Sequence, residues 1–132
     1  MADYFGTSIN ESPAIVLPAS EDMKGARGIA LAIKDGGLAK PKAGDVTIGL
    51  SLMTGEDEVA KGEDVTVQVK DIGKWIAGGA IVVGDLLTAD AEGKAVKATA
   101  GQFIMAQALT GTDNKGTLIK VQIIKAGYIK TA

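Results

Sequence analysis

The chain has 132 residues, with 14 basic and 16 acidic side chains and neither histidine nor cysteine. The missing cysteines exclude a disulfide framework and a thiolate metal site. The missing histidines remove the commonest general base and a common zinc ligand. The length suits one domain with one core. The composition therefore favours a binding or structural role over an enzyme, and no cofactor or metal is expected.

The charge pattern also argues against two classes of partner. Arg27 is the only arginine, although guanidinium groups dominate the recognition of phosphates and base edges. No window approaches the ~20 apolar residues of a membrane span. The first residues lack the basic and apolar regions of a signal peptide. We therefore expect no nucleic acid and no membrane among the partners.

Residues 1–27 differ in character from the rest and are expected to form an extended N-terminal arm. Pro13 and Pro18 disfavour a long helix and fit an arm or an edge strand. The aromatic pair Tyr4 and Phe5 has no obvious core to fill. The candidate contacts with a partner or a sister subunit are accordingly Tyr4, Phe5, Ile15 and Leu17.

From Gly28 onward the apolar residues alternate with a period of two, which indicates β-strands. The sequence Lys34-Asp35-Gly36-Gly37 is typical of a hairpin turn. The sets expected to share a face are Ile29, Leu31 and Ile33; Val46, Ile48, Leu50 and Leu52; Val65, Val67 and Val69; and Ile119, Val121 and Ile123.

Less regular strands are expected near residues 81–83, 86–88, 95–97 and 103–109. Glycine and acidic turns separate them, such as Asp90-Ala91-Glu92-Gly93. Short strands at this spacing predict an all-β fold, a small barrel or sandwich of antiparallel strands. Residues 28–132 are expected to form this single β-domain.

Trp75, the only tryptophan, has two possible placements. It precedes the turn at Gly78-Gly79 and could plug one end of the core. Because tryptophan is enriched at interfaces, it could instead anchor a subunit or partner contact. The sequence leaves both placements open.

One segment resembles a known family. It runs Ile76-Ala77-Gly78-Gly79-Ala80-Ile81-Val82-Val83-Gly84-Asp85-Leu86-Leu87-Thr88, followed by the turn Gly93-Lys94 and later by Ala106-Gln107-Ala108-Leu109. This pattern resembles the capsid cement, or head decoration, proteins of tailed bacteriophages. The likeness covers residues 28–126, except that Met105-Ala106-Gln107 stands where the family often has Gly-Val-Ala.

The resemblance implies a structural virion protein, made in the host cytoplasm and bound to the outer surface of an expanded head. Its partner would be the major capsid protein, on which it would form a homotrimer. It would clamp neighbouring capsomers together. The family has no catalytic residues to carry over to this chain.

Two other readings stay open. A biotinyl-like or lipoyl-like carrier domain would be modified at Lys94, which lies in a predicted hairpin between Gly93 and Ala95. However, Lys94 lacks the flanking residues typical of such carriers. The third reading is an enzyme subunit or small-molecule binder on a β-barrel, for which the sequence shows no converging polar groups.

Overall fold

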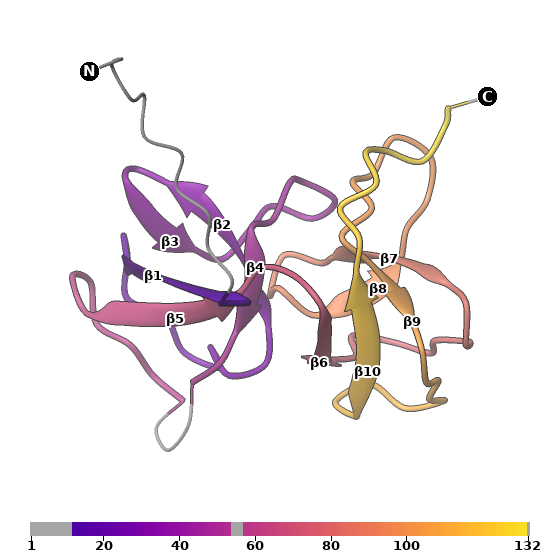
Figure 1. Ribbon diagram of the computed structural model, residues 1–132, viewed down its shortest axis with the longest axis horizontal. Helices are drawn as coiled ribbons and strands as arrows, with labels where there is room; N and C mark the ends of the chain where they lie inside the picture. Colours follow the sequence, from indigo (N-terminus) through magenta and orange to yellow (C-terminus); the bar gives the residue numbers. More distant parts are fainter. Residues whose placement is uncertain (1–11, 54–56, 132) are drawn as a thin grey trace, which may run out of the picture.

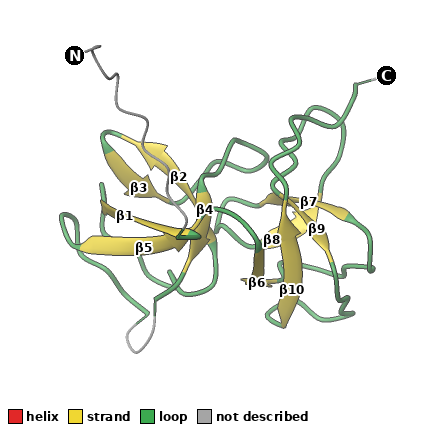
Figure 2. Ribbon diagram, in the orientation of Figure 1, coloured by secondary structure: helices red, strands yellow, loops and turns green. Residues whose placement is uncertain are grey.

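The computed structural model describes residues 12–53 and 57–131, and the described part contains ten strands and no helix. The strands form two five-stranded antiparallel sheets, one from each half of the chain (Figures 1 and 2). The all-β prediction is confirmed. Of the two architectures expected, the arrangement is sandwich-like, and neither sheet closes into a barrel.

The first sheet has the strand order β1-β5-β4-β2-β3. Its two edges approach each other at one parallel bridge between Ala19 and Leu38. Its strands are β1 (Ala14–Pro18), β2 (Ala30–Lys34), β3 (Gly37–Ala39), β4 (Gly49–Ser51) and β5 (Asp64–Gln68).

The second sheet has the order β6-β10-β9-β7-β8. Its longest strand, β10, pairs with both β6 and β9. Its strands are β6 (Ile72–Ile76), β7 (Leu86–Ala89), β8 (Ala95–Lys97), β9 (Ala106–Ala108) and β10 (Leu118–Ile123).

The described part of residues 1–27 belongs to the first sheet. Strand β1 is an edge strand that pairs only with β5, and Pro18 is its last residue. This confirms the edge-strand alternative for the segment between the two prolines. Beyond it, Ala19, Met23 and Ala26 are buried in the core of the first sheet.

The predicted hairpin at residues 34–37 is confirmed. Lys34 pairs with Gly37 across a two-residue turn. Asp35 and Gly36 have φ angles of 51° and 79°. Positive φ at both central residues is the type I′ geometry, which matches the twist of the flanking strands.

Two of the strongest alternations predict burial correctly. In β5, Val65 and Val67 are buried, and Asp64 and Thr66 are exposed. In β10, Ile119, Val121 and Ile123 are buried.

Two other predicted faces are wrong in part. Only residues 49–51 of the expected strand 46–52 form a strand, because residues 40–48 make a loop. In that loop Thr47 is buried, whereas Val46 is 51% exposed. Ile33 is 58% exposed because it lies at the end of β2, beside the hairpin turn.

Two apolar cores hold the fold together. The first lies within the first sheet and is built around Ile29, Leu31, Leu38, Val65 and Val67. The second is built around Trp75, Leu87, Met105, Ile119 and Val121. Ala30 and Leu50, from the first sheet, belong to the second core and so fasten the two halves together.

Candidate functional site

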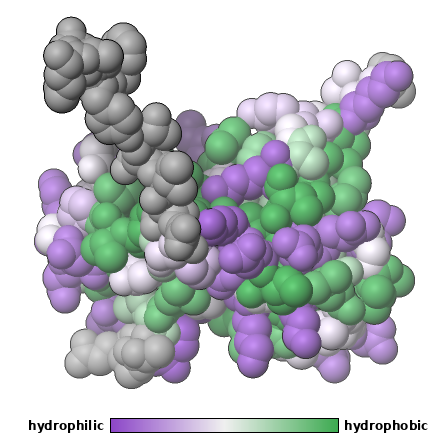
Figure 3. All heavy atoms as spheres, viewed as in Figure 1, coloured by the Kyte–Doolittle hydropathy of each residue, from purple (hydrophilic) through white to green (hydrophobic). Residues whose placement is uncertain are grey.

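Several large apolar side chains of the described residues are exposed. No group of three or more acidic side chains gathers among these described residues in a way that could hold a metal ion. No helix of the described part is long and apolar enough to cross a membrane. The candidate sites are therefore surfaces with exposed apolar side chains, and Figure 3 shows hydrophobic residues on one face of the molecule among hydrophilic ones.

Trp75 lies in the second core and is fully buried. Its indole N–H donates a 2.8 Å hydrogen bond to the carbonyl oxygen of Gly93. Burial with a satisfied N–H is the usual state of a core tryptophan. Of its two possible placements, the structure has the core placement, and no surface of the indole is left for a partner.

The other predicted contact residues lie in or before β1. Ile15 and Leu17 are half-buried and pack against the first core. Between them, Val16 is 55% exposed. Tyr4 and Phe5 lie outside the described residues, so their contact with a partner or a sister subunit stays a prediction.

Lys94 lies at the end of the turn between β7 and β8 and is half-buried. Its backbone N–H donates to Oδ1 of Asp90 at 2.9 Å, as does the N–H of Glu92. This carboxylate fixes the turn. Modification of Lys94 stays a prediction.

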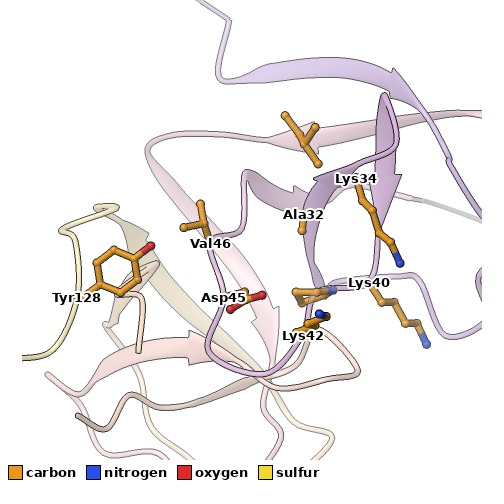
Figure 4. Close-up of a pocket in the computed structure, with 9 residues that line it drawn as sticks. Ala32, Lys34, Lys40, Lys42, Asp45, Val46 and Tyr128 are labelled. Atoms are coloured by element: carbon orange, nitrogen blue, oxygen red, sulfur yellow. The ribbon is translucent and has the colours of Figure 1, made fainter. Parts of the chain in front are cut away.

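A cleft of about 480 Å³ lies beside the C-terminal segment, and we call it the lysine cleft. Figure 4 shows Tyr128 on one side, Lys34 and Lys40 on the other, and Asp45 and Val46 between them. It combines exposed apolar side chains with cationic ones. Its lining residues are Ala32, Ile33, Lys34, Lys40, Pro41, Lys42, Asp45, Val46 and Tyr128.

Two contacts organise this cleft. The Lys40 ammonium lies 2.8 Å from a carboxylate oxygen of Glu92. The hydrogen bond and the charge of Lys40 hold the pKa of Glu92 below its ordinary value of 4.5. Tyr128 packs edge-on against Phe103, with ring centroids 5.7 Å apart. Exposed apolar side chains and lysines therefore lie side by side in this cleft.

A second recess, of about 570 Å³, lies where the two halves meet, and we call it the junction groove. Leu52, Ile72 and Leu118 are 43%, 55% and 51% exposed there. The groove is mostly apolar and has two cations. Its lining residues are Arg27, Gly28, Ser51, Leu52, Met53, Gln68, Ile72, Gly73, Lys74, Ile76, Gly116 and Leu118.

Sequence reasoning missed both recesses. The lysine cleft joins residues 32–46 to Tyr128, and the junction groove joins residues 27–28 to residues 116–118. These are long-range juxtapositions that local periodicity does not predict. The junction groove could have been suspected from two large apolar residues at the ends of predicted strands, Leu52 and Leu118.

Comparisons with known proteins give a likeness of fold. No protein-family profile matches the chain, and no curated protein does. Among solved structures, the N base of head fiber gp8.5 of bacteriophage phi29 has a similar fold, with a TM-score of 0.59. The likeness covers 89% of this chain and 98% of that one, at 20% sequence identity. The structural likeness shows that the two chains share a fold, at 20% sequence identity.

Proposed function

We propose that this chain is a non-enzymatic structural protein of a tailed-phage virion that attaches to the outer surface of the head. The observation that carries the proposal is the fold, which is similar to the N base of a phage head fiber along almost the whole of both chains. The sequence pattern at residues 76–96 supports the same class of protein independently.

The chemistry of the described residues agrees with this role. They present exposed apolar side chains and lysines, and they gather no metal-ligating cluster. A protein that only holds other proteins together needs complementary surfaces and a stable body. Two cores joined through Ala30 and Leu50 supply such a body.

The proposed task is to bind the major capsid protein and clamp neighbouring capsomers, as a homotrimer assembled on the head. Each contact in such an assembly can be weak. Engaging several subunits at once raises the effective concentration of each further contact and so the overall avidity. The protein would be made in the host cytoplasm and added to the head from outside.

We propose the lysine cleft as the first candidate for the capsid contact. It brings Ile33, Val46 and Tyr128 together, with exposed fractions of 58%, 51% and 59%. Lys34 and Lys42 flank these side chains and would favour an acidic segment of the capsid protein.

The test is a density gradient of particles from the source culture, probed for this chain. Co-migration with DNA-filled heads at a fixed number of copies per head would support the proposal. Protease treatment of intact heads then tests the outer location, since an external protein is digested while the capsid shell stays whole. Recovery of the protein only from the soluble fraction would contradict the proposal.

A further inference from the structure

The junction groove lies next to the point where the described chain begins. The carbonyl oxygen of Pro13 accepts a 2.7 Å hydrogen bond from the N–H of Val69. Ala14 stands opposite Gln68 in the β1–β5 pair, and Gln68 lines the groove. Opposed residues of an antiparallel pair lie about 4.5–5.5 Å apart and point to the same face. Ala14, two residues after the first described residue, therefore lies within one strand spacing of a groove residue.

The groove gathers exposed apolar side chains from both halves of the molecule. Ile72 on β6 and Leu118 on β10 are each about half exposed. Close packing of Ile76 and Leu118 against Gly28 forms the floor, where an added Cβ would lie 3.2 Å from Ile76. The volume of about 570 Å³ accommodates several apolar side chains.

Residues 1–11 complement this groove in chemistry. They contain Tyr4 and Phe5 as well as Met1 and Ile9. Their charged side chains are Asp3 and Glu11, with no lysine or arginine. The groove presents Arg27 and Lys74, so the charges of the two are opposite in sign. A segment tethered next to its site needs little intrinsic affinity, since short tethers give effective concentrations of about a millimolar.

We propose that residues 1–11 of the same chain fold back into the junction groove and that Tyr4 and Phe5 cover Ile72 and Leu118. Aromatic side chains there would bury the apolar faces of both residues. Asp3 would lie toward the cationic side of the groove. Tyr4 and Phe5 would then bind within their own chain, and not to the partner or sister subunit expected from the sequence.

Disulfide trapping tests this directly, because the chain has no cysteine of its own. One purified full-length protein carries Phe5→Cys with Leu118→Cys, and a second carries Phe5→Cys with Val16→Cys. Val16 is 55% exposed, close to residue 5 along the chain, and not part of the groove. Val16 lies in β1, two residues after Ala14, so an undocked tether should reach residue 16 more readily. Docking reverses that order, and we expect the bond to residue 118 to form about tenfold faster.

A matched variant removes two of the remaining apolar side chains without changing the length of the tether. Tyr4→Ser with Ile9→Ser, added to the Phe5→Cys and Leu118→Cys protein, should slow the bond about tenfold. An unchanged rate, or faster bonding to residue 16, would overturn the proposal. Disulfide-linked dimers without the intramolecular bond would also overturn it, because they assign the segment to a neighbouring copy. These measurements use no capsid, so their outcome is independent of the proposed function.

Discussion

The indole N–H of Trp75 and the backbone N–H of Ala30 both donate 2.8 Å hydrogen bonds to the carbonyl oxygen of Gly93. One acceptor therefore joins the first sheet to the second at the turn before β8. All three residues are buried, so the hydrogen bonds compete with no solvent. This shared carbonyl is one of several polar links between the halves, which also include the hydrogen bond from the N–H of Ile76 to the carbonyl oxygen of Gly28.

Replacing Trp75 should destabilise the whole fold. Trp75→Phe keeps an aromatic ring but loses the N–H donor and some volume, which should cost about 1–3 kcal/mol of unfolding free energy. Trp75→Ala should cost about 3–5 kcal/mol because it leaves a cavity in the second core. Urea unfolding followed by circular dichroism measures both, and it avoids fluorescence because Trp75 is the only tryptophan.

The matched control for this experiment is Val82→Ala. Val82 is 69% exposed and lies in the turn before β7, outside both cores. Its replacement should change the unfolding free energy by less than about 0.5 kcal/mol. A Trp75→Phe protein as stable as Val82→Ala would contradict the role given to the indole hydrogen bond.

Gly93→Ala tests how closely the turn must approach β2. Gly93 has a φ of 81°, and an added Cβ would lie 2.6 Å from the carbonyl oxygen of Ala30. Gly116 has a similar φ of 89° and no atom within 4 Å of such a Cβ. Gly116→Ala should cost only the ~1–2 kcal/mol of left-handed backbone.

Gly93→Ala carries the same backbone cost and, in addition, the steric clash. We expect a further loss of ~1–3 kcal/mol relative to Gly116→Ala. Thermal or urea unfolding of the two proteins side by side gives the difference. Equal stability would mean that the turn moves away from Ala30 without penalty.

Much of the fold could be predicted from the sequence where alternation was long and turns were specific. Val65 and Val67, and Ile119 and Val121, are buried as predicted, because their side chains point to the face of each strand that packs into a core. The Asp35-Gly36 turn was also predictable, since few dipeptides adopt positive φ at both positions.

Prediction failed where tertiary contacts decide which residues are covered. Val46 is exposed and Thr47 is buried, which is the reverse of what the alternation predicts. Residues 40–48 form a loop that is held by contacts with the second half of the molecule and is not part of a strand. The hydrogen bond from Gly44 to Ala89 is one such contact. The two recesses depend on this long-range packing, which explains why neither could be located from local patterns.

The Lys40–Glu92 pair predicts a defined pH response. Its contribution to stability is present above the ordinary carboxyl pKa of 4.5 and is lost as the pH falls through the lowered pKa of Glu92 in the folded protein. A titration followed by NMR should therefore place the pKa of Glu92 below 4.5. In Lys40→Met, the pKa of Glu92 should rise toward its ordinary value. An unchanged pKa in that variant would mean that Lys40 is not its cause.

Reversing charges in the lysine cleft tests the proposed capsid contact. Lys34→Glu with Lys42→Glu changes two exposed lysines of the cleft, whereas Lys97→Glu with Lys115→Glu makes the same change in net charge elsewhere on the surface. Charge complementarity at an interface accelerates association, so the first pair should slow attachment to heads by about tenfold or more. The second pair should attach like the unmodified protein.

Salt dependence separates a direct contact from a general effect of net charge. At 0.15 M salt exposed charges are screened beyond ~8 Å, so attachment of the unmodified protein should weaken as salt rises from a low concentration. The Lys34→Glu, Lys42→Glu protein should lose most of this dependence, and the Lys97→Glu, Lys115→Glu protein should keep it. Co-sedimentation with heads across a salt series measures both. If the two double variants lose attachment equally, the cleft is not the contact, and the exposed valines at 82 and 83 become the next surface to alter.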